Sequence, residues 1–480
     1  MDNQTKKIFA SFGWITIIRS SERLLGFVTT LILAKYIAPE AFGIIAIAAM
    51  LIDIIQIFKD FGISQALIYK KSDINIASIT AFWLMVTYNI ILFLIAALAA
   101  PYASYIYDIS IITPVIILFS SNLIWNSFRA VPAALIEKNI DFKKLLVPDI
   151  LPIVAASVIS ILMAIKGMGV WSLVTRSLII NIGSMILIWK YTAFRPAFRF
   201  DVKIARDMLS YGKYLVGASV LAAALYNVDK MCVSKFIGVA ELGYYTFAMS
   251  IAILPVSEIG HVVCRVMFPV LTEINQNEEA LRSTFLTTIK YTGAISIPLS
   301  LGICIYGPSL INILYGTTWL PMVLPLQIFS IYALFRSISV VIAETFKATG
   351  ATALIQKYTF IRLLCISILC IPAIKLQGLA GICMLVTITY GGVLIIESIK
   401  ICKQTKLGLF SYLEVFYLPI IISLLVIPFI YYVMRFSTDL KSMYVMIFAI
   451  STTIVVYIML LSFCDRSFIS LLSNMIHQKG

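Results

Sequence analysis

Residues 9–37 read FASFGWITIIRSSERLLGFVTTLILAKYI, an apolar run long enough to cross a membrane as a helix. Near its middle lie Arg19, Glu22 and Arg23, spaced i, i+3 and i+4, so a helix presents all three on one face. Charged side chains in hydrocarbon are costly, so this face is predicted to meet a protein interior or a water-filled cavity. Two interpretations stay open: the charges mark a transport path, or Glu22 neutralises an arginine and holds helices together.

The rest of the chain has the same character. Its 480 residues are 61% hydrophobic and 12% charged, with a mean hydropathy of +0.99. A soluble domain carries about 25% charged residues. Apolar segments of membrane-spanning length recur from end to end, without the alternation that a β-barrel shows. The sequence therefore predicts an all-α polytopic membrane protein.

We expect about fourteen transmembrane helices, arranged as two parallel six-helix lobes around a central cavity plus two extra C-terminal helices. The N-terminal lobe is predicted at 1–206, the C-terminal lobe at 207–405, and the additional spans with a cytoplasmic tail at 406–480. A proline, Pro255, is expected to kink the long eighth span. The approximate spans are 9–36, 41–62, 77–100, 109–135, 145–165, 169–191, 208–235, 240–272, 284–306, 320–348, 353–375, 377–401, 411–434 and 441–463.

An internal repeat supports the two lobes. Leu33–Ala48 reads LAKYIAPEAFGIIAIA, and Val233–Ala248 reads VSKFIGVAELGYYTFA. Lysine, glycine and alanine coincide at Lys35/Lys235, Gly43/Gly243 and Ala48/Ala248. Each segment follows the first span of a six-span block, so both copies have the same orientation. Parallel repeats of this kind place a transport path between the lobes.

Loop charges predict the orientation. Basic residues concentrate in the segments that are cytoplasmic if both termini are cytoplasmic, as positively charged inner loops require. The net charge of +14 is therefore an orientation signal, and no nucleic-acid partner is expected. The longest basic stretch, 190–206, is either a hinge between the lobes or an ordinary inner loop.

Arginine predominates among the bases considered inside the spans, and its planar fork suits bidentate contact with phosphate. The candidates for binding an anionic substrate are Arg19, Arg23, Arg176, Arg265 and Arg336. The candidates for ion coupling, or alternatively for structural charge pairs, are Glu22, Asp53, Asp229, Lys230, Glu258 and His261. Glu344 and Glu397 lie near span ends and are expected to snorkel or cap.

Other site chemistry is not expected. The eight cysteines form no CxxC pair, only two histidines are present, and no phosphate-binding GxxxxGK[ST] loop occurs. The sequence predicts no catalytic residues, no metal site, no cofactor and no enzyme activity.

Three stretches carry a family resemblance: LAKYIAPEAFGIIAIAAM (33–50), FKDFGISQALIYKK (58–71) and TAFWLM (80–85). They resemble the polysaccharide transporter family of the multidrug/oligosaccharidyl-lipid/polysaccharide flippase superfamily. This family includes Wzx-type O-antigen flippases and exporters of colanic and teichuronic acid units. The resemblance is most specific over about residues 9–90.

The resemblance implies a flippase of the bacterial inner membrane that moves undecaprenyl-pyrophosphate-linked oligosaccharide repeat units by alternating access, for O-antigen, capsule or exopolysaccharide biosynthesis. Its partners would be this lipid-linked substrate, membrane lipid, and the polymerase and glycosyltransferases of the pathway. Coupling to protons or sodium is left open, and a monomer is expected. The alternatives are a lipid II flippase or multidrug exporter of the same superfamily, or, in another class, a membrane polysaccharide polymerase.

The predicted orientation can be tested by labelling. In a background without the native cysteines, a cysteine replacing Lys35 or Lys235 should react with a membrane-impermeant thiol reagent added to intact cells. A cysteine replacing Lys190 should react only after permeabilisation. The opposite pattern would overturn the orientation.

Overall fold

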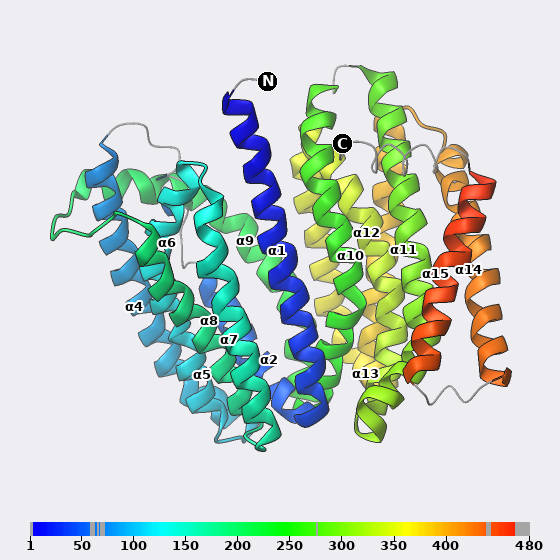
Figure 1. Ribbon diagram of the computed structural model, residues 1–480, viewed down its shortest axis with the longest axis horizontal. Coiled ribbons are helices and arrows are strands. Elements are labelled where there is room, and N and C mark those ends of the chain that lie inside the picture. The colour runs from blue at the N-terminus through cyan, green and yellow to red at the C-terminus, as the bar shows by residue number, and fades with distance from the viewer. Residues whose placement is uncertain are drawn as a thin grey trace. The chain divides into compact units, whose positions relative to one another are not determined.

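The computed structural model describes the backbone of residues 3–57, 63, 64, 67, 73–274, 277–437 and 443–465, and most of their side chains. This part of the chain is almost entirely helical, with fourteen α-helices and no strands, which confirms the all-α prediction (Figure 1). Within it, eight stretches are long and apolar enough to cross a membrane. The chain forms two compact units, Met1–Gly243 and Tyr244–Gly480.

The first unit is built from helices connected by short turns. Helix α7 packs against α8 and α1, while α4 packs against α5 and α6, and these helices can be followed at the blue-to-cyan end of Figure 1. Their bounds are α1 (Asn3–Tyr36), α2 (Pro39–Gln56), α4 (Ile74–Tyr107), α5 (Ile112–Ser120), α6 (Asn122–Lys138), the 3-10 turn η1 (Phe142–Leu145), α7 (Leu146–Ile165), α8 (Val170–Tyr191), α9 (Val202–Phe236) and the start of α10 (Val239–Glu273).

The predicted span 109–135 is interrupted. Helix α5 ends at Ser120 and α6 begins at Asn122, so the predicted span consists of two helices with a local break at Ser121, whose own backbone stays right-handed helical. The hydroxyls of Ser120 and Ser121 donate to the carbonyls of Ile117 and Leu118, at 3.0 and 2.7 Å. Such local hydrogen bonds compete with the helical ladder and explain the break.

The second unit contains the remaining helices. The long helix α13 is two helices joined at Gln377 and Gly378, close to the predicted boundary between spans 353–375 and 377–401. Gly378 has φ +56° and ψ −132°, a conformation that a Cβ strongly disfavours. The bounds are α11 (Glu278–Tyr315), the 3-10 turn η2 (Gly316–Met322), α12 (Val323–Ala348), α13 (Thr352–Gln404), α14 (Leu409–Ser437) and α15 (Met443–Cys464).

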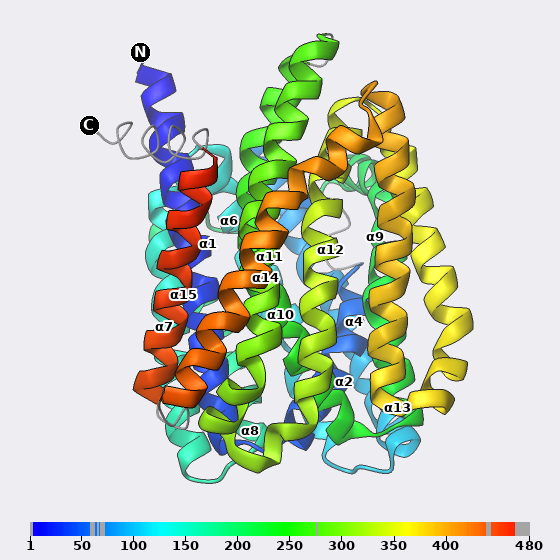
Figure 2. The ribbon, with the colours of Figure 1, turned by 90° about the vertical axis from the view of Figure 1, so that its right-hand side faces the viewer.

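The two extra C-terminal helices are integral to the second unit. Helix α14 packs along α11, and α15 packs against α14, as Figure 2 shows. One apolar core joins α11, α12, α13 and α14 through Phe285, Phe346, Tyr358 and Tyr412, respectively. In the first unit, α9 packs against α2 and α4. The predicted lobe boundaries at 206 and 405 come from the six-span repeat and not from helix packing. They stay a prediction.

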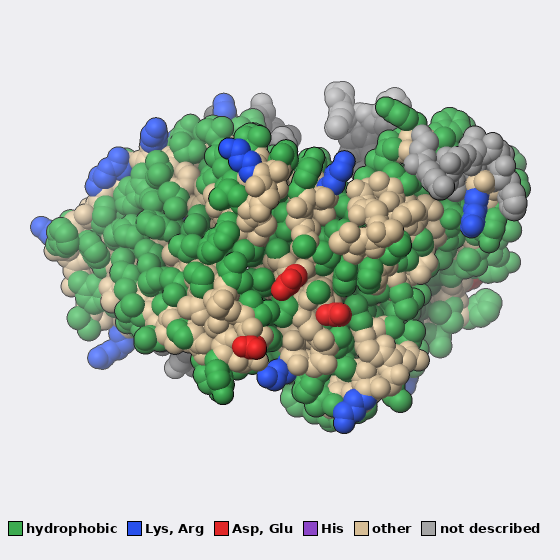
Figure 3. All heavy atoms as spheres, turned by 90° about the horizontal axis from the view of Figure 1, so that it is seen from below, with side chains coloured by type: hydrophobic (Ala, Val, Ile, Leu, Met, Phe, Trp, Pro, Cys, Tyr) green, Lys and Arg blue, Asp and Glu red, His purple; other side chains and the backbone are tan. Residues whose placement is uncertain are grey.

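Large apolar side chains cover much of the outer surface. Leu98, Phe410 and Phe463 are each at least 80% exposed. Even the end-on face in Figure 3 shows extensive hydrophobic areas with only scattered charges. A surface of this kind suits hydrocarbon rather than water, so the chain is a multi-pass membrane protein.

The repeated turns around Gly43 and Gly243 touch each other reciprocally. A Cβ placed at position 43 would lie 1.8 Å from the carbonyl oxygen of Val239. One placed at position 243 would lie 2.0 Å from the carbonyl oxygen of Pro39. Positions 39 and 239 correspond in the repeat, as do 43 and 243, so the contact is what a local two-fold relation between the turns produces. Glycine is required at both sites because backbone meets backbone.

Alanine at Gly43 or Gly243 should therefore destabilise the protein by about 1–3 kcal/mol, since the carbonyl that it meets cannot move like a side chain. The measurement is the thermal midpoint of the purified chain in detergent. Gly392→Ala is the matched control, because a Cβ there meets nothing within 4 Å. Equal midpoints for all three variants would show that this contact is absent.

Candidate functional site

A ladder of polar side chains joins α6 to α8. The amide of Asn122 donates to Ser177 Oγ at 2.9 Å, and that of Asn126 donates to Asn181 Oδ1 at 2.8 Å. The partners lie at i, i+4 and i+7 on each helix, which places them on one face of it. We call these three pairs the polar ladder: Asn122–Ser177, Asn126–Asn181 and Arg129–Ser184.

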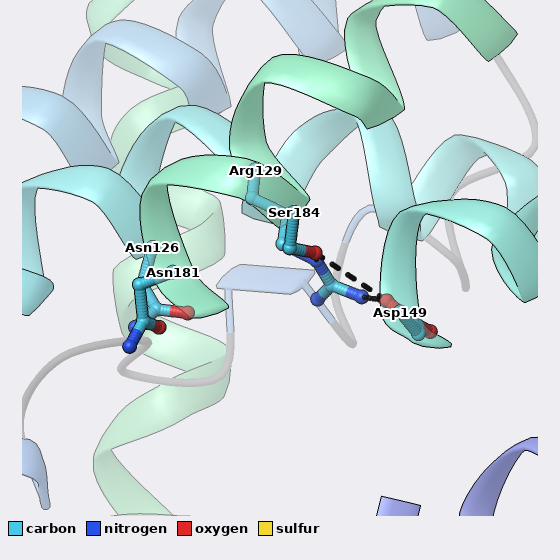
Figure 4. A network of polar contacts seen from close by, with 5 residues as sticks. All are labelled: Asn126, Arg129, Asp149, Asn181 and Ser184. Carbon is cyan, nitrogen blue, oxygen red and sulfur yellow. Dashed lines mark hydrogen bonds and ion pairs between the residues drawn. The ribbon is translucent and has the colours of Figure 1, made fainter. Parts of the chain in front are cut away.

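The third rung of the ladder carries an ion pair. Arg129 donates through Nε to Ser184 Oγ at 2.7 Å and through Nη2 to Asp149 Oδ1 of α7 at 2.5 Å. Ser184 Oγ also donates to the same carboxylate oxygen at 3.4 Å. Figure 4 shows the three groups converging from α6, α7 and α8. Among the described residues Nη1 of Arg129 has no partner, so the guanidinium keeps free donors.

The predicted stripe on α1 belongs to the same neighbourhood. Helix α1 packs on α7, and Glu22 interacts electrostatically with Asp149 and Arg129 as well as with Arg19 and Arg23. Arg19 is exposed, whereas Glu22 and Arg23 are half-buried. We call the following six groups the charged cluster: Arg19, Glu22, Arg23, Arg129, Glu137 and Asp149.

The charged cluster is balanced. Its three arginines are matched in number by three carboxylates, so the formal charges of the cluster sum to zero. Attraction between opposite charges therefore offsets part of the desolvation free energy that burying these groups costs. Any attraction for an anion must come from how individual arginines are aimed rather than from an excess of positive charge.

A pocket of about 220 Å³ adjoins Arg129. Besides Arg129, its polar lining includes Asn89 of α4, Asn126 and Glu137 of α6, and Ser64. Amides, a carboxylate and a guanidinium are groups that hydrogen-bond to hydroxyls and to phosphate oxygens. The volume lies below the roughly 300–1,000 Å³ of small-molecule sites, so the pocket accommodates only a part of a large ligand.

Arg176 ties α8 to α1. Its Nη2 donates to the carbonyl of Gly26 at 3.1 Å, and Nη1 donates to Thr30 Oγ1 at 3.4 Å. Its Nε is buried without a hydrogen-bond partner among the described residues. Arg176 thus links helices inside the first unit, which is the structural interpretation of this candidate.

The candidates on α2 and α9 lie in different surroundings. Asp53 has an exposed side chain. Asp229 is 5% exposed and accepts from the backbone amide of Lys230 at 2.9 Å. Lys230 itself is half-buried. The structure places none of these three within the ladder or pocket contacts described above.

On α10 the second predicted stripe is outside the described side chains. The helix continues through these positions, but the side chains of 255–269 are not described. The expectations for Glu258, His261 and Arg265, and for the kink at Pro255, therefore lie beyond the part of the chain that the structure describes.

In the second unit Arg336 borders an aromatic group. Its Nη1 donates to the hydroxyl of Tyr332 at 3.4 Å, and the Tyr332 ring meets the Tyr390 ring edge-on at 4.6 Å. The guanidinium of Arg362 stacks over Tyr390, with its carbon 4.6 Å from the ring centre. Cation–π contact of this kind helps to hold an arginine away from water.

Arg362 forms a buried network with Glu397 and Ser339. Its Nη2 donates to Glu397 Oε1 at 2.8 Å and to Ser339 Oγ at 3.0 Å, and Ser339 donates to Glu397 Oε2 at 2.7 Å. The two charged side chains are 9% and 6% exposed. The expectation that Glu397 snorkels or caps is therefore wrong. Near the end of a predicted span it is still enclosed by α12 and the first half of α13.

Sequence reasoning missed Arg129, Asp149 and Arg362. All three lie inside the predicted spans 109–135, 145–165 and 353–375, so the same criterion, a charge within an apolar run, identifies them. The amides of the polar ladder carry no comparable signal. Asparagine in an apolar run is unremarkable until its partner on another helix is known.

Comparison with known proteins assigns the family. Residues 32–324 match the family described as "Polysaccharide biosynthesis protein". The chain belongs to this family of polysaccharide biosynthesis proteins.

Relatives of this family member come from several bacteria. The chain is 22% identical over 360 residues to the lipopolysaccharide biosynthesis protein WzxC of Escherichia coli K12, covering 74% of this chain and 72% of that one. It is 22% identical to the succinoglycan biosynthesis transport protein ExoT of Rhizobium meliloti, covering 65% and 64%. It is 24% identical to the teichuronic acid biosynthesis protein TuaB of Bacillus subtilis, covering 58% and 59%.

Solved structures of similar fold are membrane transporters. The lipid II flippase MurJ in an inward closed conformation matches with a TM-score of 0.76 at 15% identity, covering 95% of this chain and 99% of that one. An inward-facing multidrug transporter of the MATE family matches with a TM-score of 0.64 at 14% identity, covering 81% and 98%. At these identities the likeness shows the fold of the family member alone.

The buried pair in the second unit predicts a large stability effect. Arg362→Leu or Glu397→Leu should each cost about 3–5 kcal/mol, because the remaining charge is left buried without its partner. The double replacement should recover much of the loss. The measurement is the thermal midpoint in detergent.

The exposed pair Lys406–Glu278, at 72% and 69% exposure, is the matched control. Lys406→Gln there should change stability by about 0–1 kcal/mol. A double replacement of Arg362 and Glu397 no better than the single ones would contradict charge pairing as the cause.

Proposed function

We propose that this protein is a flippase that moves oligosaccharide repeat units, linked through pyrophosphate to undecaprenol, across the bacterial inner membrane. The repeat units would serve surface polysaccharide biosynthesis. The observation that carries the proposal is the arrangement in the first unit of this polysaccharide biosynthesis protein. Arginine, amide and carboxylate groups gather at a pocket lined mainly by α4 and α6.

The physical task explains why such groups are needed. A sugar–pyrophosphate head carries several charges and many hydroxyls, and stripping its water in hydrocarbon is prohibitively costly. Protein donors and acceptors along the path replace that water. A transporter does this without consuming a bound nucleotide if an electrical gradient supplies the work. For an anion moving outward, an inside-negative potential supplies roughly 2.3 kcal/mol per charge per 100 mV.

The proposed roles of individual groups follow from their contacts. Arg129 donates through Nε to Ser184 and through Nη2 to Asp149, and Nη1 is the proposed donor to a ligand oxygen. Asn89, Asn126 and Glu137 are suited to sugar hydroxyls at the same pocket. Arg19 and Arg23 on α1 are the proposed pyrophosphate contacts, because Arg19 is exposed and Arg23 only half-buried.

Arg176 is the weaker candidate, since α1 already engages it through Gly26 and Thr30. Arg265 and Arg336 remain proposed substrate contacts of the second unit. Alternating access, with both termini in the cytoplasm, is the proposed transport cycle. Glu22, Asp53, Asp229 and the other candidate carboxylates are the proposed binding groups for a proton or a sodium ion, if either is coupled to the cycle.

Replacement of the arginines tests the proposal. In a deletion strain, lipid-linked repeat units should accumulate on the inner leaflet. Arg129→Ala should lower the rate of surface polysaccharide formation by about 10–100-fold, the effect of losing a charge-assisted hydrogen bond. Arg19→Ala with Arg23→Ala should abolish it, and lysine at these positions should restore it partly. The readouts are cell-surface polysaccharide and the amount of protein in the membrane.

Arg206→Ala is the control, because Arg206 is an exposed arginine of α9. It should leave polysaccharide unchanged. A normal amount of surface polysaccharide with both Arg19 and Arg23 replaced would contradict the proposed role of the α1 arginines. A deletion strain that does not accumulate lipid-linked repeat units on the inner leaflet would contradict the proposed function.

A further inference from the structure

Two adjoining pockets of the second unit lie outside the site described above. The first, about 370 Å³, lies between α11, α14 and α15, in the N-terminal half of α11. Its polar lining is Lys290 and Tyr291 of α11, Ser411 and Glu414 of α14, and Asp465 after α15. The volume is typical of a small-molecule site.

The second pocket, also about 370 Å³, is almost wholly apolar. It follows the seam between α11 and α15, where its lining includes Pro298, Gly302, Ile450, Ile454 and Ile458. A Cβ at Gly302 would meet nothing within 4 Å, so the seam is open at that point. The surface therefore offers van der Waals contact to hydrocarbon.

The few hydroxyls of the apolar pocket are already satisfied. Tyr306 and Thr453 share a hydrogen bond of 2.7 Å, and Tyr457 donates to the carbonyl of Ala294 at 2.7 Å. These groups have no need of a polar ligand. An occupant of this pocket is a chain without hydrogen-bonding groups.

The two pockets form one continuous groove along the same helix faces. Ala294 lines both of them. On α15 the polar pocket is lined by Leu461 and Asp465, and the apolar pocket continues one turn earlier at Ile458 and Ile454. A polar end followed by an apolar trough matches a lipid, with its head at Lys290 and a chain along the seam.

The charges at the polar end select the head. Lys290 pairs with Asp465, while Glu414 is exposed and forms no ion pair among the described residues. Among the described residues that line the polar pocket, one cation and two carboxylates sum to a formal charge of −1. A phosphate oxygen can share Lys290, whose ammonium has three donors, and a ligand ammonium is needed to match Glu414.

We propose that this groove binds one zwitterionic aminophospholipid, with its phosphate at Lys290, its ammonium at Glu414 and one acyl chain in the seam between α11 and α15. Phosphatidylglycerol, an anionic phospholipid, lacks the ammonium. A polyprenyl pyrophosphate brings two or more negative charges against two carboxylates. Because bilayer chains are as apolar as the seam, selection comes from the head rather than from hydrophobicity. The site does not rest on the proposed transport function.

Retained lipid tests the proposal. The full chain is reconstituted in bilayers with equal phosphatidylethanolamine and phosphatidylglycerol, extracted in detergent, and analysed by native mass spectrometry. The wild-type chain should retain phosphatidylethanolamine over phosphatidylglycerol by about fivefold. Gly302→Trp, which fills the seam, should reduce retention by about fivefold or more, while Glu414→Gln should abolish the preference between heads.

Gly392→Trp is the matched control, because Gly392 also faces open space but lies on α13, away from the groove. Gly302→Leu serves if the larger side chain prevents folding, as judged by the thermal midpoint. Equal retention in the Gly302 and Gly392 variants would overturn the site. Equal retention of the two phospholipids by the wild type, or displacement of phosphatidylethanolamine by undecaprenyl phosphate, would overturn the proposed occupant.

Discussion

The structure depends on one constraint: a polar or charged side chain inside a membrane-length helix must find its partner within the protein, since hydrocarbon offers none. In the first unit the constraint is met by Arg129 and Asp149, and by Arg176 against α1. In the second unit it is met by Arg362 and Glu397. Each of these contacts joins two different helical segments, so pairing the charges also positions the helices.

Helix packing in an apolar protein adds a second requirement, because no hydrophobic driving force distinguishes a helix neighbour from lipid. Close backbone contact supplies part of the answer. Gly43 and Gly243 bring two repeated turns together with nothing between their backbones. The two similar segments of the sequence thus correspond to a physical contact, and sterics explains the coincident glycines.

The charged cluster in the first unit differs from the positively charged wall that the sequence suggests. From the sequence, arginines inside spans suggest a positively charged wall for an anionic cargo. Around Arg19 and Arg129, however, carboxylates equal the arginines in number. Recognition of phosphate at such a site depends on directed N–H groups, such as Nη1 of Arg129, and not on the overall field. At the polar end of the α11–α15 groove, by contrast, the described carboxylates outnumber the basic groups. This end therefore fits a different class of lipid.

The sequence by itself determined the helical class and the approximate limits of most helices, because hydropathy is a local property of about 20 residues. It also placed a boundary between two spans at 375–377, close to the observed break at Gln377 and Gly378. It did not find the interruption at Ser121, which rests on hydroxyl-to-backbone bonds, or the burial of Glu397 near the end of a span. Only the tertiary structure decided which charges pair and which keep free donors, because a partner on another helix leaves no trace in local composition.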